Sequence, residues 1–208
     1  MLRSPFRLLL PALALVLVLT ASLAGAASAS ASAKGSSVRL VGDKTKLVTD
    51  PVTTRILLDN GIWPQPVGPT RFDLLEREGG LSVRYAFPIT GGTVDLTALT
   101  GRIDHSGGID FVNTKNGKSL LLTDFRIKLG KRVLTAEVNG DPSVRVPVLA
   151  LDYSRAKIVG GGRVVRIKNV AGTLTETAAS ALNSSLGVTF FAPGITLGTA
   201  QVFARVAA

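Results

Sequence analysis

The stretch LSVRYAFPITGGTVDLTALTGRIDH, residues 81–105, decides the fold class of this chain. Its first part, Leu81–Pro88, alternates apolar and polar residues, which is typical of a β-strand with one buried face. Ile89–Gly92 predicts a turn, Thr93–Leu99 predicts the next strand, and Thr100–Gly101 predicts another turn. This rhythm indicates strands that follow one another at close spacing.

The same rhythm continues towards the C-terminus. Further strands are predicted at Arg102–His105, Ile109–Asn113, Ser119–Leu129, Val133–Val138, Val144–Leu151, Ala156–Val159 and Val164–Val170. The dipeptides Asn116-Gly117 and Asn139-Gly140 predict tight turns, because Asn and Gly both tolerate a positive φ. We therefore expect an all-β fold, an antiparallel sandwich or a barrel-like sheet.

Two segments interrupt the strand rhythm and predict short helices. The first, residues 49–62, has a good N-cap at Asp50 and a stop at Gly61. The second, residues 175–188, ends at Gly187.

The two predicted helices align at a constant offset, which places Val52 beside Ala178 and Ile56 beside Leu182. An internal duplication explains this alignment, and chance similarity of two capped helices is the alternative. A duplication predicts that all four of these side chains face the core, since they recur at helical spacing.

The N-terminus has charged, then apolar, then small residues, the order that is typical of a secretory signal peptide. Arg3 and Arg7 precede an apolar run, residues 8–19, and small residues follow from Ala21 to Ala33. An uncleaved membrane anchor is the alternative interpretation, because the segment is long enough to span a bilayer.

We expect residues 1–26 to be the signal peptide, residues 27–36 to be a flexible Ser/Ala-rich start of the mature chain, and residues 37–208 to form a single β-rich domain. The expected location is secreted, extracellular or cell-wall associated, with no stable membrane span after cleavage. The chain contains no Cys, so packing and not disulfides must stabilise the exported domain.

The formal net charge is +10, and much of the excess lies in the C-terminal half. The candidate basic surface consists of Arg155, Lys157, Arg163, Arg166 and Lys168. Such a surface suits anionic cell-wall polymer or lipid headgroups, although a solvated outer face of a sheet has the same pattern. A nucleic-acid partner is not expected, because aromatic residues are sparse and do not alternate with the basic ones.

The residues that carry chemistry are few. His105 is the sole histidine, so with no Cys the chain lacks the usual zinc ligands, and we expect no metal site. No nucleophile or phosphate-loop motif occurs, which predicts a non-catalytic protein. His105 suits either a haem ligand or a hairpin residue bonded to backbone, and Tyr85 and Asp95 are expected at a similar height on adjacent strands.

The segments Gly101–Ile109, Leu121–Ile127 and Leu134–Val138 resemble the core of the HtaA-type domain, a family of secreted and surface proteins of actinobacteria. The resemblance implies capture of haem, with His105 matching the histidine of the family. It also implies a Tyr ligand near the start of the domain, a region that contains no Tyr here, so Tyr85 is the upstream candidate.

We therefore expect one of two functions. The first is a secreted non-catalytic binding domain with haem as the candidate ligand, through His105 and Tyr85. The second is a structural or adhesive cell-envelope protein that binds anionic wall polymer through its basic sheet face.

Overall fold

The computed structural model describes residues 37–208, so the expected signal peptide and the segment 27–36 lie outside the described residues. In chain order the elements are β1 (Ser37–Thr49), α1 (Pro51–Asp59), β2 (Ile62–Val67), β3 (Arg71–Arg77), β4 (Gly80–Asp95), β5 (Thr100–His105), β6 (Gly108–Asn113), β7 (Ser119–Lys128), β8 (Val133–Val138), β9 (Asp141–Asp152), β10 (Lys157–Gly161), β11 (Val164–Leu174), α2 (Glu176–Leu186) and β12 (Thr196–Val206). Within this range, neither helix has the length and apolar run needed to cross a bilayer.

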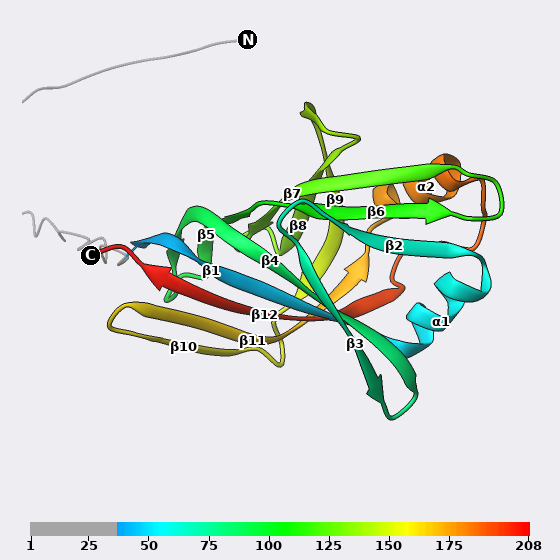
Figure 1. Cartoon of the computed structure of the whole chain (residues 1–208). Coiled ribbons are helices and arrows are strands. Elements are labelled where there is room, and N and C mark those ends of the chain that lie inside the picture. Colours follow the sequence, from blue (N-terminus) through cyan, green and yellow to red (C-terminus); the bar gives the residue numbers. More distant parts are fainter. Residues whose placement is uncertain (1–36) are drawn as a thin grey trace, which may run out of the picture. The chain divides into compact units, whose positions relative to one another are not determined.

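Eight strands close into an antiparallel barrel, which confirms the barrel-like alternative of the sequence prediction. Around the ring the order is β1, β4, β5, β7, β8, β9, β11 and β12, and β12 pairs with β1 to complete it (Figure 1). Side chains alternate between the interior and the outer surface along each strand. The interior is therefore filled mainly by aliphatic and aromatic residues.

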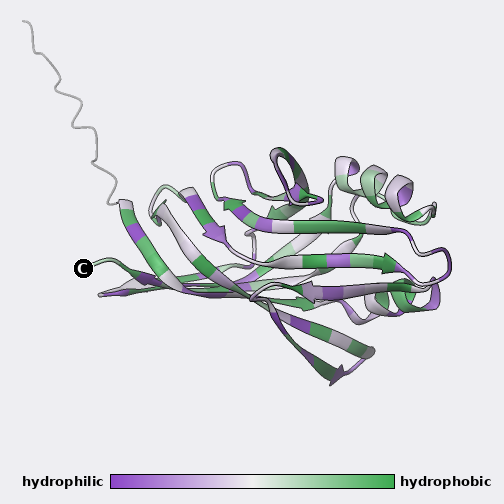
Figure 2. Ribbon diagram, turned by 45° about the horizontal axis from the view of Figure 1, so that its top comes forward, coloured by the Kyte–Doolittle hydropathy of each residue, from purple (hydrophilic) through white to green (hydrophobic). Residues whose placement is uncertain are grey.

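Four strands, β2, β3, β6 and β10, extend the sheet beyond this ring. β2 pairs with β6, which follows β5 along the same side of β7. β3 pairs with the first half of β4, and β10 pairs with β11. The β3–β4 hairpin flares away from the body of the barrel in both ribbon views (Figures 1 and 2).

The predicted turn at Ile89–Gly92 is wrong, because β4 runs through it. The register shifts between Ile89 and Gly91, so these residues form an irregularity within one long strand. Gly92 permits close approach of the neighbouring strand, since a Cβ there would lie 2.2 Å from the Arg102 carbonyl oxygen. The sequence pattern marked a glycine pair correctly but did not distinguish a bulge from a turn.

The long β4 strand also separates residues that we expected to find together. Tyr85 and Asp95 lie on the same strand, at its middle and its end. The carboxylate of Asp95 accepts hydrogen bonds from the backbone N–H groups of Thr97 and Ala98, both at 2.9 Å. Asp95 therefore stabilises the β4–β5 turn and does not join a cluster with His105.

Both helices form where the sequence predicts them. The Asp50 side chain caps α1 by accepting from Thr53 N, and Thr175 caps α2 by accepting from Ala178 N. The tight turn predicted at Asn139-Gly140 is confirmed as well, because both residues have a positive φ. β1, β2, β3 and β12 had no counterpart in the prediction.

The predicted register of the helix duplication is wrong for α1. Ala178 and Leu182 are buried as expected, but Val52 and Ile56 are exposed. The N-caps align Asp50 with Thr175, one residue away from the predicted offset. A slip of one residue turns a helix by about 100°, so the buried residues of α1 are Thr53, Thr54 and Leu57.

Replacing Leu182 by Ala should lower the free energy of unfolding by about 2–5 kcal/mol, because this side chain is 1% exposed and its removal leaves a cavity. Replacing Ile56, which is 40% exposed, should cost less than about 1 kcal/mol. Urea denaturation monitored by circular dichroism checks both values. Equal losses for the two variants would contradict the assigned faces of the helices.

Candidate functional site

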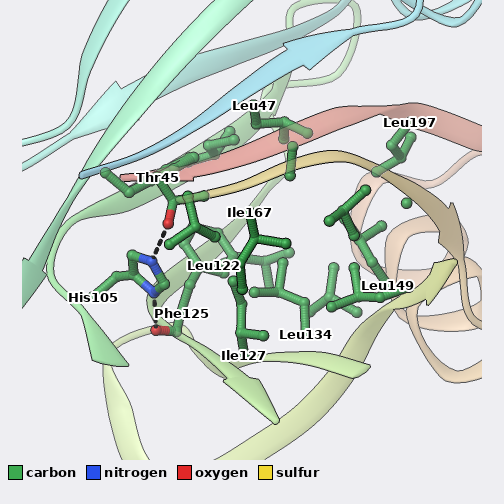
Figure 3. A pocket seen from close by; sticks show the side chains of 18 of the residues that line it. Thr45, Leu47, His105, Leu122, Phe125, Ile127, Leu134, Leu149, Ile167 and Leu197 are labelled. Atoms are coloured by element: carbon green, nitrogen blue, oxygen red, sulfur yellow. Dashed lines mark hydrogen bonds between the residues drawn. The ribbon is translucent and has the colours of Figure 1, made fainter. Parts of the chain in front are cut away.

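His105 lies inside the barrel at the end of β5 and is almost fully buried. Its Nδ1 donates to the Phe125 carbonyl oxygen at 3.0 Å, and the Thr45 hydroxyl donates to its Nε2 at 2.7 Å (Figure 3). A carbonyl oxygen only accepts, so the proton of the neutral ring must be on Nδ1. The imidazole thus joins β5 to its neighbour β7 and, across β4, to β1 from within the barrel.

Burial lowers the pKa of His105 to about 4, although the bond to Phe125 and the nearby Asp104 carboxylate act in the opposite direction. The ring is therefore neutral at physiological pH, and both of its nitrogens are engaged. This environment agrees with the expectation of a histidine bonded to backbone.

Tyr85 also points into the interior but does not meet His105. Its hydroxyl donates to the Pro64 carbonyl oxygen at 2.6 Å, which connects β4 to β2 where the two strands are not paired. Phe87 stacks on the Tyr85 ring at 6.1 Å and meets Phe125 edge-on at 5.0 Å. These aromatic contacts connect Tyr85, through Phe87, to Phe125, whose carbonyl oxygen accepts from His105.

The barrel interior contains an apolar cavity of about 70 Å³. His105 and Thr45 lie at one side of it, and aliphatic side chains form most of its wall (Figure 3). Its lining includes Leu122, Ile127, Leu134, Leu149, Ile167 and Leu197. Tyr153 also borders the cavity, and sequence reasoning gave this residue no role.

His105 and Tyr85 do not fit the role of haem ligands in this arrangement. Both side chains are buried, and their polar atoms already bond to protein groups. Sites that enclose drug-sized ligands measure about 300–1,000 Å³, far more than the cavity beside His105. The cavity beside His105 is therefore too small to enclose a porphyrin.

An exposed apolar surface, which the sequence analysis did not identify, lies on α1 and the β3–β4 hairpin. Its members are Val52, Ile56, Phe72, Leu74 and Leu81, and we call it the α1–hairpin surface. Phe72 and Leu74 lie across from the buried residues Tyr85 and Val83, so they continue the core face of β4 beyond the covered region. The alternation of residues 71–77 was the signal that could have revealed them.

The five predicted basic residues lie on or beside the β10–β11 hairpin. Lys168 is half-buried and the other four are exposed. Across the hairpin, Lys157 pairs with Lys168 and Val159 pairs with Arg166. None of the five takes part in the ion pairs formed among residues 37–208.

The stability of the barrel should fall when the pH is lowered from about 6.5 to about 4. An unfolded chain takes up a proton on His105 in this window, whereas the folded chain with its lowered pKa does not. The contribution of this group to the free energy of unfolding is complete above pH 6.5, and about 3 kcal/mol of it is lost towards pH 4. Urea denaturation of wild type and His105→Gln at several pH values measures it. Identical pH dependence in both proteins would contradict the assignment.

No family model and no curated protein matches the sequence. Among the solved structures that resemble the fold are two of the same HtaA domain. The C-terminal domain of HtaA from Corynebacterium glutamicum superposes with a TM-score of 0.55 at 14% identity, over 82% of this chain and 99% of that one. A domain-swapped dimer of a histidine-to-alanine variant of the same domain gives 0.50 at 16% identity, over 75% and 91%. The described residues therefore have the fold of an HtaA-type domain.

Proposed function

We propose that the chain is an exported, non-catalytic binding domain that holds haem, or a similarly flat amphipathic anion, on its α1–hairpin surface. The observation that carries the proposal is the exposure of large apolar side chains there. Leu74 is 62% exposed and Val52 is 60% exposed. Contiguous exposed apolar residues on a soluble domain mark interaction sites.

The two parts of this surface are close together. The turn of the β3–β4 hairpin lies against α1, since a Cβ at Gly79 would be 3.3 Å from Pro51 and one at Gly80 would be 3.6 Å from the Arg55 guanidinium. Pro51 and Arg55, one helical turn apart, therefore form the side of α1 that meets the hairpin, and Val52 and Ile56 each follow one of them in the sequence. A flat ligand can therefore contact helix and hairpin at once.

Charged side chains border the apolar residues. Arg55 is exposed and takes part in none of the ion pairs of the described range, so it is available to a ligand carboxylate. Glu76 lies across from Leu81 on the same face, which gives the surface one acidic edge. An amphipathic ligand would place its apolar body over Leu74 and its acid group towards Arg55.

Export is inferred from the N-terminal sequence, and haem is inferred from the resemblance to a family of haem-capturing surface proteins. The fold is compatible with binding because the closed barrel holds α1 and the base of the hairpin in place. Neither His105 nor Tyr85 is required to touch the ligand in this proposal.

Replacing Phe72 and Leu74 together by Ser should weaken haem binding at least about tenfold, because each buried side chain of this kind contributes about 1.5–3 kcal/mol. Absorbance titration with haemin measures the affinity and reports the Soret band. Val159→Ser, a change of another exposed residue on β10, is the matched control and should bind like wild type.

His105→Gln and Tyr85→Phe test the ligation hypothesis in the same titration. If both side chains are structural, the haem spectrum of either folded variant should equal that of wild type. Loss of the spectrum in Tyr85→Phe, together with normal binding by the Phe72/Leu74 variant, would refute the proposed surface and favour direct ligation.

A second candidate function is adhesion to anionic wall polymer through the outer basic face. Lys157 and Lys168 lie directly opposite each other, and like charges in this position destabilise a strand pair. In the neighbouring row of residues across the sheet, Arg166 of β11 pairs with Phe203 of β12. Phe203 pairs in turn with Lys44 of β1. A phosphate-rich polymer would relieve the repulsion between these cations.

Replacing Lys157 and Arg166 by Gln should weaken binding to inorganic polyphosphate at least about tenfold and reduce its salt dependence, because exposed charges act mainly through screened electrostatics. Co-sedimentation with isolated wall polymer and fluorescence titration with polyphosphate measure this effect. The charge-matched control replaces Lys118 and Arg77, which are exposed outside this face. Equal losses in both double variants would indicate a general charge effect and exclude a site.

A further inference from the structure

We propose that the interior of the barrel is a second binding site, for one short aliphatic chain that ends in a carboxylate. The chain would lie in the apolar cavity, and the carboxylate would bind at Tyr153 and Arg132. This site is separate from the α1–hairpin surface and does not depend on the proposal made for it.

The size and lining of the cavity define the class of ligand. Eight-stranded barrels have interiors that side chains just fill or that hold one small ligand. A single water needs about 10–15 Å³ of such space, so 70 Å³ corresponds to roughly five to seven groups of that size. The wall is aliphatic and aromatic, so water is disfavoured and a slender hydrocarbon chain of about six to eight carbons fits.

Tyr153 supplies an unused polar group at this cavity. Its hydroxyl is buried and has no hydrogen-bond partner among the described residues. A buried polar atom without a partner is rare in folded proteins and calls for a specific cause. Burial raises the pKa of Tyr153 to about 12, so the hydroxyl keeps its proton and is a donor at neutral pH.

Arg132 brings a positive charge to the same end of the barrel. It lies in the turn after Leu129, a cavity residue, and its carbonyl oxygen accepts from Leu151 N at 2.8 Å. Its side chain is exposed, forms no ion pair within residues 37–208, and is close enough to lower the pKa of Tyr153 against the effect of burial. A carboxylate there would accept from both side chains.

The other side of the cavity determines the orientation of the ligand. Both His105 nitrogens are engaged, one by Thr45 and one by the Phe125 carbonyl oxygen. This pair therefore offers no free N–H donor to a carboxylate. Tyr153 follows the end of β9, just beyond the pairing of Asp152 with Ala171. The acid group accordingly belongs at the Tyr153 end, with the hydrocarbon chain directed towards His105.

Sodium octanoate is the probe. Titration of the full domain should shift the backbone amide resonances of cavity residues such as Ile127 and Ile167 in a saturable manner. Tyr153→Phe and Arg132→Gln should each weaken octanoate binding about tenfold. Arg77→Gln removes the same charge at an exposed position on β3, outside the cavity lining, and should leave the affinity unchanged.

Ala200→Leu places extra side-chain volume in the cavity and should abolish octanoate binding without affecting the haemin titration. The inference is overturned if octanoate shifts no cavity amide in wild type, or if Tyr153→Phe and Arg132→Gln both bind it as tightly as wild type. Because Tyr153→Phe removes only one oxygen atom, this test remains decisive even if the larger side chain introduced by Ala200→Leu impairs folding. Failure of haemin binding with intact octanoate binding would count against the α1–hairpin surface alone.

Discussion

The two interior hydrogen bonds of His105 hold the barrel together at the point where β5 ends and β6 begins. Immediately after His105 the chain leaves β5 and starts β6, and the kink at Ser106 and Gly107 allows β6 to continue along β7. A Cβ at Gly108 would lie 2.3 Å from the Leu122 carbonyl oxygen, so the new strand requires glycine there. The imidazole fixes the end of β5 to β1 and β7, which allows the backbone to turn without opening the ring.

This irregularity also determines where the surfaces of the protein lie. β5 pairs with the second half of β4, but its continuation β6 pairs with β2 instead. The first half of β4 is therefore not paired with β5 or β6, and it forms the flared hairpin with β3. Tyr85 connects the separated strands through its bond to Pro64. The exposed apolar residues of the hairpin are thus a consequence of the same geometry that buries Tyr85 and His105.

The interior, the α1–hairpin surface and the basic face consist of different residues of the described domain. The interior is apolar because inward-facing residues of eight strands meet there, whereas the β10–β11 hairpin carries its cations on the outer side of the sheet. The proposed apolar ligands and the proposed anionic polymer would therefore contact different residues. The proposed sites can therefore be tested by separate substitutions.

Local patterns in the sequence were sufficient for the strands of the middle region, the two capped helices and the Asn139-Gly140 turn. These features depend on neighbouring residues, such as the Asp50 side chain that satisfies Thr53 N. The Gly91–Gly92 pair was misleading, because glycine serves a close strand approach as well as it serves a turn. Likewise, the side of α1 that is buried depends on a one-residue difference in helix register.

The strand-rich class, the excess of basic residues and the presence of one histidine can be read from the residue pattern alone. The folded structure is needed to see that His105 is buried and neutral, that Tyr85 joins two unpaired strands, and that the Tyr153 hydroxyl has no partner beside a cavity. The physical reason is that these properties come from residues distant in the chain. Thr45, Pro64 and Arg132 come from other elements of the fold, and the closure of the barrel brings them close to these side chains.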